Sequence, residues 1–201
     1  RRVDFAPNSP WKYKRADAFV TVSDAVSKIM SEHVPLRKIF RVYDGVFSPP
    51  SHPPAPDSPR VLAVGARVNH KGHHVLSQAA QLLSGLDIGI AGEGPLCFPN
   101  LRYLGYRNDI PALFAGADLF VHPSIEEGLG QVVIEAMMAG LPVIVTKAGG
   151  LPEVVGQVGC VVPSNDPVAL AKAIEESLQI GEHRSLIGRQ WAKKHFSVST
   201  M

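Results

Sequence analysis

Apolar and polar positions alternate in two different rhythms along the chain after residue 59. Short apolar runs that end at glycine or at a polar residue are typical of parallel strands buried on both faces. Six such runs occur, at 60–65, 87–91, 101–105, 118–122, 142–146 and 159–162. Segments with helical character lie between them, at 75–83, 109–116, 131–139 and 167–179. This order predicts an α/β fold with an open, doubly wound parallel sheet.

The first part of the chain has a different pattern. It predicts a strand at 16–23, a helix at 24–30 and a strand at 38–45, which is one βαβ unit that cannot bury its faces alone. The next twelve residues contain six prolines and are therefore expected to be extended. The expected division is the end of one domain at 1–47, a linker at 48–59 and a second domain at 60–201.

Composition narrows the class of protein. The 201 residues have a net charge of +2 and 45% apolar side chains, which suits a soluble globular protein and gives no electrostatic case for binding nucleic acid. Cys97 and Cys160 lie beside apolar residues, so we expect buried free thiols in a reducing compartment. No apolar run approaches the roughly 18–20 residues of a membrane span. The chain starts Arg-Arg without methionine, and we expect it to be a piece of a longer protein.

Ligands of a doubly wound sheet bind at the carboxyl ends of the strands, near helix N-termini. The segment GARVNHKG brings Gly65, Arg67 and Lys71 to that edge. The two cations suit a diphosphate, and they suit an ordinary solvated loop equally well. The GxGxxG fingerprint of dinucleotide sites is missing, because the glycines of GEG (92–94) lead to a proline and not to a helix. A nicotinamide-dependent oxidoreductase is therefore disfavoured.

The segment SIEEGLGQVVIE reaches the same edge. Gly128 and Gly130 bracket the start of a predicted helix, where free N–H groups are open to an anion. Glu127 lies just outside that start and Glu135 just over one turn inside it. Carboxylates so close to an anion site are expected to accept hydrogen bonds from neutral sugar hydroxyls. Glu135 could instead face solvent, but its neighbours are apolar and a glutamate near a core normally has a partner.

Other polar residues near this edge are less informative. The segment 104–124, with Ser124 in its last turn, is best interpreted as ordinary loops on sequence alone. Three histidines form a candidate metal cluster, although histidines beside a lysine in a loop are more often solvated: His70, His73 and His74. His122 ends a strand at the site edge, where it either touches a ligand or packs.

Together these segments resemble a known family. Seven residues separate Glu127 from Glu135 in the frame PSxxEGxGxxxxEAMxxGxPVI. This frame resembles the retaining GT-B glycosyltransferases that use nucleotide-sugar donors, a group that contains glycogen synthases, sucrose synthases and many bacterial lipopolysaccharide and capsule sugar transferases. VTVSDAVSKIM and KIFRVYDGV resemble the end of that family's N-terminal acceptor domain. VLAVGARVNHKGHHVL and GCVVPSNDPVALAKAI resemble parts of its C-terminal, Rossmann-like donor domain.

The resemblance implies roles for individual residues. Arg67 and Lys71 would hold the donor diphosphate, with Gly65 beside them. Glu127 and the amides of the segment Gly128–Gly130, which includes Leu129, would meet the transferred sugar and its phosphate, next to Ser124. Glu135 would bind the ribose hydroxyls, and the base would rest near Arg107. This chain departs from the usual pattern at Ala66, where the family usually has arginine, and at Leu129, where an aromatic residue is often found.

The resemblance also implies a hexosyltransferase that works without a metal or another cofactor. Its donor would be linked to UDP, GDP or ADP and its acceptor would be a glycan or a lipid. It implies a cytoplasmic protein, with peripheral contact to the inner face of the membrane through the N-terminal half. Two alternatives stay open, a nucleotide-sugar-binding module without catalysis and a GT-B-fold epimerase. We expect this chain alone to bind a donor and to transfer nothing.

Overall fold

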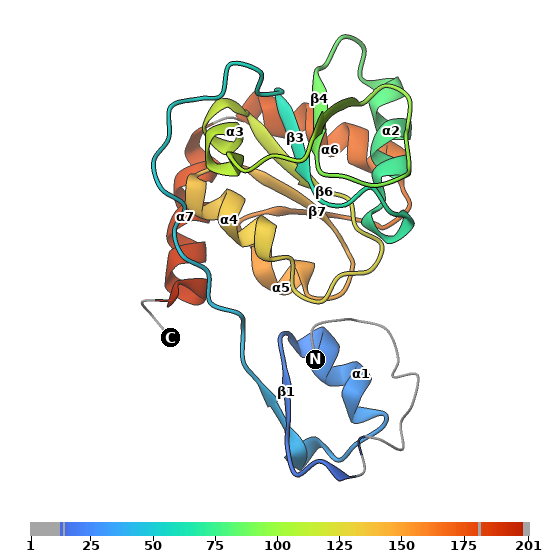
Figure 1. Cartoon of the computed structure of the whole chain (residues 1–201), viewed down its shortest axis with the longest axis vertical. Helices are drawn as coiled ribbons and strands as arrows, with labels where there is room; N and C mark the ends of the chain where they lie inside the picture. Colours follow the sequence, from blue (N-terminus) through green and yellow to red (C-terminus); the bar gives the residue numbers. More distant parts are fainter. Residues whose placement is uncertain (1–12, 14, 181, 199–201) are drawn as a thin grey trace.

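The computed structural model describes residues 13, 15–180 and 182–198 (Figure 1). Its main feature is a six-stranded parallel sheet with the strand order β5-β4-β3-β6-β7-β8. The strands are β3 (Val61–Val64), β4 (Ile88–Ala91), β5 (Arg102–Gly105), β6 (Leu119–His122), β7 (Val143–Thr146) and β8 (Cys160–Val162). Each strand lies inside one of the predicted apolar runs, so the predicted α/β sheet is confirmed. The chain reverses its direction of winding at β3 and β6.

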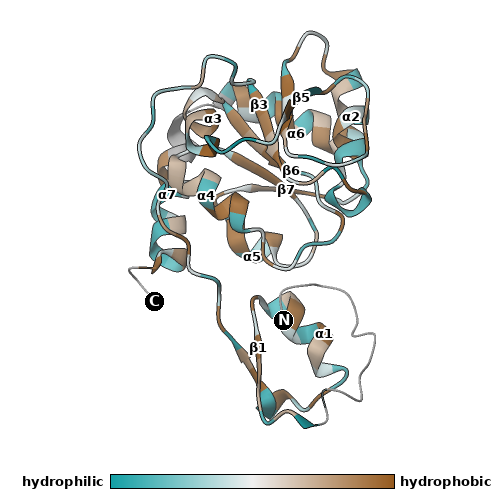
Figure 2. Cartoon of the chain, viewed as in Figure 1, coloured by the Kyte–Doolittle hydropathy of each residue, from teal (hydrophilic) through white to brown (hydrophobic). Residues whose placement is uncertain are grey.

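Helices cover both faces of this sheet. Successive strand residues point to opposite faces, so Leu119 and Val121 of β6 join one apolar cluster while Phe120 joins the other. The first cluster lies under α2 (His73–Leu82) and α6 (Pro167–Ile180). The second lies under α3 (Ile110–Gly116), α4 (Gln131–Ala139), α5 (Leu151–Val155) and α7 (Glu182–Phe196). Figure 2 shows the apolar residues that run along the strands between these layers.

The helix predictions were confirmed for α2, α3, α4 and α6, whereas α5 and α7 were not foreseen. α5 has five residues, too few to show a helical period. α7 has a long polar sequence with a glycine in it, so its apolar period is weak. A short 3₁₀ turn, η3 (Asn69–Lys71), precedes α2 and carries one of the predicted cations.

Residues 15–47, which we call the front unit, form a smaller βαβ element below the large sheet in Figure 1. It contains β1 (Phe19–Thr21), α1 (Asp24–Ser31), η2 (Leu36–Lys38) and β2 (Ile39–Arg41), and its two strands pair in parallel. Its strands are shorter than predicted, because the pairing covers only three residues of each. Val22, Val26 and Met30 belong to the same apolar cluster as α4. The front unit therefore shares a core with the large sheet.

The proline-rich segment 48–59 contains no helix or strand. The chain just before it is anchored where Val46 pairs with Ser197 beyond the end of α7, and the Val46 amide donates to the Phe196 carbonyl at 2.8 Å. Farther along, the Ala55 amide donates to the Ala112 carbonyl of α3 at 3.0 Å. The linker therefore runs along the edge of α3 and α4, as the trace in Figure 1 shows.

Two predictions about burial were wrong. Neither Cys97 nor Cys160 forms a disulfide within the described residues, as predicted, but Cys97 is exposed and Cys160 is half-buried. Cys97 lies in the irregular segment between β4 and β5, where no layer covers it. His73, the first residue of α2, is buried rather than solvated, while His70 is exposed.

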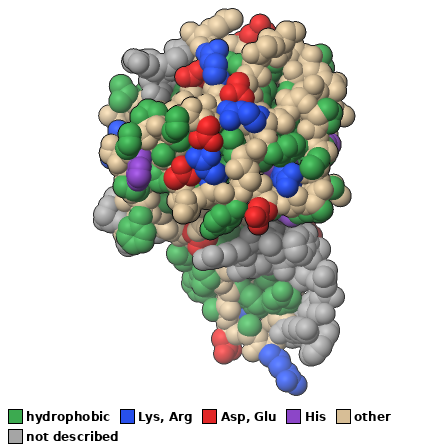
Figure 3. Space-filling view, turned by 45° about the horizontal axis from the view of Figure 1, so that its top comes forward, with side chains coloured by type: hydrophobic (Ala, Val, Ile, Leu, Met, Phe, Trp, Pro, Cys, Tyr) green, Lys and Arg blue, Asp and Glu red, His purple; other side chains and the backbone are tan. Residues whose placement is uncertain are grey.

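Charged side chains of both signs are interspersed on the face shown in Figure 3. Within the described residues, no helix is both long enough and apolar enough to cross a membrane.

Candidate functional site

The site lies where β3 and β6 end side by side, at the point where the sheet changes its winding direction. The loop after β3 leads through η3 to Lys71, and the loop after β6 leads to Glu127. The two loops touch through their backbones, since the Ile125 amide donates to the His70 carbonyl at 2.8 Å. At Gly72, where φ is +67°, a Cβ atom would lie 1.8 Å from the carbonyl oxygen of Pro123, so only glycine allows this approach.

Glu127 is the centre of a polar cluster. Its Oε2 atom lies 2.7 Å from Nζ of Lys71 and 2.8 Å from Nε2 of His122. The hydroxyl of Ser124 donates to the same oxygen at 3.3 Å and lies 3.1 Å from Nε2 of His122. The hydroxyl of Thr146, at the end of β7, donates to the carbonyl of Ser124. Three neighbouring strands therefore fix the position of one carboxylate.

Burial and charge set the protonation of this cluster. Burial alone would raise the pKa of Glu127, but its contacts with His122 and Lys71 lower that pKa to about 2. Burial lowers the pKa of His122 below its usual value, although Glu127 opposes the change. A carboxylate can only accept, so Nε2 of a neutral His122 must carry the proton. Near neutral pH, Glu127 is ionised and accepts from both Lys71 and His122.

Nearby, burial lowers the pKa of His73 to about 4, helped by the charge that His122 carries when it is protonated and by the positive charge of Lys71. Its Nδ1 atom has no hydrogen-bond partner among the described residues. Across the described part of the chain, no three His, Cys, Asp or Glu side chains are placed to hold a metal ion.

A polar cavity of about 250 Å³ opens beside the cluster. Residues 60–180 and 182–198, which we call the large unit, line it with Lys71, Glu127 and the first residues of α4. Gly130 begins this helix with φ at +90° and no side-chain cap, so the first amides of α4 face the cavity region. Two residues of the front unit, Val22 and Asp44, complete the wall. These two residues and Gln131 were not foreseen, because nothing in the sequence places the front unit against α4.

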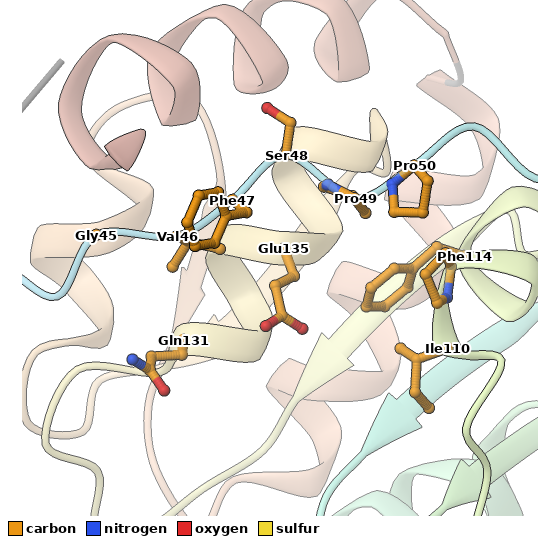
Figure 4. A pocket seen from close by; sticks show the side chains of 11 residues that line it. Gly45, Val46, Phe47, Ser48, Pro49, Pro50, Ile110, Phe114, Gln131 and Glu135 are labelled. Carbon is orange, nitrogen blue, oxygen red and sulfur yellow. The ribbon is translucent and has the colours of Figure 1, made fainter. Parts of the chain in front are cut away.

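A second cavity of about 370 Å³ lies between the linker, α3 and α4 (Figure 4). Ile110 and Phe114 line one side and residues 45–50 the other. Figure 4 shows the Glu135 carboxylate pointing into this space. Burial raises the pKa of Glu135. Gln131 lines both cavities, so they adjoin along the first turns of α4.

The other predicted site residues lie elsewhere. Arg67 donates to the Leu96 carbonyl at 3.2 Å, and its guanidinium lies 4.7 Å from the ring centre of Tyr103. Arg107 bonds Asp57 of the linker and Asp109 before α3, with closest N–O distances of 2.5 and 2.7 Å. Neither arginine lines either cavity.

The remaining predicted residues differ in whether they line the polar cavity. Gly65 donates its amide to the Ala91 carbonyl at 2.9 Å, and Leu129 is buried and lines the polar cavity. The Gly128 carbonyl accepts from the Ser23 hydroxyl of the front unit at 2.8 Å. The structure thus brings together Lys71, Ser124, Glu127 and the segment that starts α4, while Glu135 lies at the neighbouring cavity.

Comparison with known proteins identifies the family of this chain. The family model described as "Glycosyl transferases group 1" matches residues 58–179. The O-antigen chain mannosyltransferase B of Escherichia coli is 44% identical over 88 residues, which is 43% of this chain and 23% of that protein. The putative colanic acid biosynthesis glycosyltransferase WcaL of Salmonella typhimurium is 30% identical over 215 residues, which is 90% of this chain and 52% of that protein. The chain therefore spans between about a quarter and a half of these relatives.

Solved structures show the same fold. Anabaena Alr3699/HepE, solved in complex with UDP, superposes with a TM-score of 0.79 at 23% identity, over 92% of this chain and 61% of that one. TarM superposes with a TM-score of 0.82 at 16% identity, over the whole of this chain and 47% of that one. These neighbours are GT-B glycosyltransferases, so the predicted GT-B-type fold is confirmed. The chain belongs to the glycosyl transferases group 1 family.

Proposed function

We propose that this chain binds the nucleotide-sugar donor of a retaining, metal-independent hexosyltransferase. The observation that carries the proposal is the pair of adjoining cavities along α4, one polar and charged and one walled by apolar residues, each with one glutamate of the Glu-x7-Glu frame. A nucleotide sugar has the matching order of parts, with an apolar base, a ribose, a charged diphosphate and a polar sugar.

The nucleoside fits the larger cavity. The side chains of Ile110 and Phe114 and the prolines of the linker offer apolar surface to a base. Glu135 has no hydrogen-bond or ion-pair partner among the described residues, and a carboxylate can accept from two vicinal hydroxyls at once. A ribose would therefore satisfy a group that the protein leaves unpaired. Arg107 lies outside this cavity, so its predicted contact with the base remains a prediction.

The diphosphate and the sugar fit the polar cavity. Lys71 and the first amides of α4 supply positive potential for the phosphates. Glu127 would repel a phosphate, so we assign it to the hydroxyls of the transferred sugar, with His122 keeping it in place. A diphosphate would compete with Glu127 for Lys71. The predicted role of Arg67 at the diphosphate requires its guanidinium to leave Leu96 and Tyr103.

The proposed reaction takes place on one face of the sugar. The bond between the anomeric carbon and the diphosphate oxygen breaks, and a bond to the acceptor oxygen forms on the same face. The proton of the acceptor hydroxyl passes to the departing diphosphate. Lys71 and the amides of α4 stabilise the charge that develops on that phosphate, and contacts to the sugar hydroxyls place the anomeric carbon. The donor supplies both the transferred group and the leaving group, so the scheme uses no further cofactor.

The relatives support a donor and acceptors of this kind. One neighbour was solved with UDP and, in another crystal, with UDP-glucose. The names of other relatives refer to O-antigen and to lipopolysaccharide core biosynthesis. We therefore propose a UDP-, GDP- or ADP-linked donor and a glycan or lipid acceptor. The cytoplasmic location and the contact with the inner membrane face stay predictions.

The test is titration calorimetry of the chain with UDP, GDP, ADP and their glucose-linked forms. One diphosphate is expected to bind clearly better than the others. Its sugar-linked form is expected to make additional hydrogen bonds from the sugar hydroxyls to Glu127. Binding of none of them would contradict the proposal. Incubation with the preferred donor and a panel of acceptors tests catalysis. Release of an altered nucleotide sugar without an acceptor would indicate an epimerase instead, and transfer by this chain alone would contradict the expectation that it only binds a donor.

A further inference from the structure

The N-terminus of α1, in the front unit, is capped by a side chain of the large unit. Glu153 belongs to the first turn of α5, and its two carboxylate oxygens accept hydrogen bonds from the backbone amides of Asp24 and Ala25, at 2.7 and 2.8 Å. The hydroxyl of Tyr43 donates to Oε2 of Glu153 at 3.3 Å. These partners are separated from Glu153 by 110 to 129 positions in the sequence. One carboxylate therefore joins two places of the front unit, the start of α1 and Tyr43, to the large unit.

This contact fills a need of the helix. The first amides of an α-helix have no partner within the helix. In α1 the third of them, that of Val26, donates to the Ser23 hydroxyl at 3.1 Å, while the first two depend on Glu153. A carboxylate at a helix N-terminus is favoured by the helix dipole as well as by these two bonds. The front unit thus lacks a complete cap for α1 unless it lies against α5.

The front unit also contacts the segment beside the polar cavity. The Ser23 hydroxyl donates to the carbonyl of Gly128, the residue that follows Glu127. Val22 and Asp44, which are the immediate neighbours of Ser23 and Tyr43, line the cavity opposite Lys71 and Glu127. Ser23 and Tyr43, which bond the large unit, are therefore each adjacent in sequence to a residue that forms the cavity wall.

We propose that Glu153 is a positioning residue for the donor site. It touches neither cavity, but it holds the front unit so that Val22 and Asp44 close the polar cavity over the sugar end of the donor. This inference rests on the proposed function for the identity of the ligand. The nucleoside end does not depend on Glu153 in the same way, because the linker wall has anchors of its own at Phe196 and Ala112. Loss of Glu153 should therefore weaken the sugar-linked donor more than the nucleoside.

The experiment compares Glu153→Ala and Glu153→Gln with the unmodified chain. The matched control is Glu176→Gln, an exposed glutamate on α6 that pairs with Lys172 at 3.8 Å. Amide hydrogen exchange of Asp24 and Ala25, followed by NMR, reports the contact itself. Calorimetry with the preferred nucleoside, its diphosphate and the glucose-linked diphosphate reports the site. Thermal unfolding shows whether the large unit stays folded.

In Glu153→Ala, exchange at Asp24 and Ala25 should become at least tenfold faster, and affinity for the glucose-linked diphosphate should fall about tenfold, equivalent to about 1.4 kcal/mol. Affinity for the nucleoside should change less than about twofold. Glu153→Gln keeps one acceptor oxygen, so its exchange rates and its affinity for the glucose-linked diphosphate should lie between those of Glu153→Ala and those of the unmodified chain. Glu176→Gln should behave like the unmodified chain.

Three results would overturn the inference. Unchanged exchange at Asp24 and Ala25 would show that the contact does not exist in solution. Faster exchange with full affinity for the glucose-linked diphosphate would show that the contact does not serve the site. Equal losses for the nucleoside and the glucose-linked form would make Glu153 a general structural residue. If the unmodified chain binds no nucleotide at all, the proposed function fails first, and the exchange data still report the contact separately.

Discussion

The two cavities along α4 differ in whether the protein supplies hydrogen-bond and ion-pair partners for the glutamate that each contains. Glu127 is paired by Lys71, His122 and Ser124, and the contacts with His122 and Lys71 lower its pKa to about 2 despite its burial. Glu135 has no partner among the described residues, and burial raises its pKa. Side chains of the protein therefore hold the first carboxylate in place. The second carboxylate is unpaired among the described residues, and under the proposed function a ribose would supply its partner.

The largest expected effect concerns the paired glutamate. The pKa of Glu127 in the folded chain, about 2, lies below its usual value of 4.5, so ionised Glu127 stabilises the fold above pH 4.5 and loses that contribution as the pH falls toward 2. The contribution is on the order of 3 kcal/mol. Urea unfolding of the unmodified chain and of Glu127→Gln should therefore differ at pH 7 and converge in acid. The exposed Glu126→Gln is the control, and a difference that stays constant with pH would show that the ion pairs contribute nothing.

The second effect concerns the unpaired glutamate. Glu135→Ala should weaken binding of the nucleoside and of its diphosphate alike, because a hydrogen bond to a charged group contributes about 1.5–3 kcal/mol, or roughly 10- to 150-fold in affinity. Calorimetry with both ligands measures the loss, with Glu126→Ala as the matched control. Unchanged nucleoside affinity would place the ribose elsewhere. Affinity should also fall as the pH drops through the raised pKa of Glu135, since the protonated acid accepts poorly.

A third, smaller effect separates the two cations of the loop after β3. Lys71→Ala should lower affinity for the diphosphate about tenfold and leave the nucleoside unaffected, because its role is that of a point charge at the polar cavity. Arg67→Ala should change diphosphate affinity less than Lys71→Ala, since Arg67 bonds Leu96 and stacks on Tyr103. Lys172→Ala on α6 is the control, and repeating the titrations at high salt should shrink the Lys71 effect. An Arg67 loss as large as that of Lys71 would show that Arg67 swings into the site.

The smallest effect has the opposite sign. Glu135→Gln removes a partly buried charge that lacks a partner, so the variant should be slightly more stable than the unmodified chain at pH 7, by less than about 1 kcal/mol. The raised pKa means that the folded chain holds this proton more tightly than the unfolded chain, so the difference should vanish at acidic pH. Thermal unfolding at pH 7 and pH 4 measures it. A less stable variant at pH 7 would indicate that Glu135 has a structural partner after all.

The same comparison explains which parts of the molecule could be predicted from sequence. The six strands were predictable because buried parallel strands leave short apolar runs, and the start of α4 was predictable because Gly130 and a helical period meet there. The Lys71 and Glu127 loops followed from the rule that strand ends share an edge. The cavity around Glu135 was not predictable, because residues 45–50 reach it through contacts that have no local pattern. Glu153 was missed for the same reason.

Arg67 illustrates the limit at the scale of one residue. It was grouped with Lys71 because both lie in one loop of eight residues, GARVNHKG. Its amide donates to the Glu93 carbonyl at 2.7 Å, and its guanidinium lies at Leu96 and over the Tyr103 ring of β5 instead of at the polar cavity. Sequence spacing predicts that both cations lie in one loop. The direction of each side chain depends on how the backbone of this loop pairs with the segment after β4.

The backbone contact at Gly72 has a consequence for recombining this chain with other members of its family. Because this glycine lies against the Pro123 carbonyl and His70 accepts from Ile125, the loops 65–72 and 122–128 contact each other through their backbones. Recombination between family members should therefore treat the two loops as one exchangeable cassette. A chimera that takes both loops from one parent protein keeps the spacing between the residues at positions 71 and 127. A chimera that takes the loops from two different parents must re-establish that spacing.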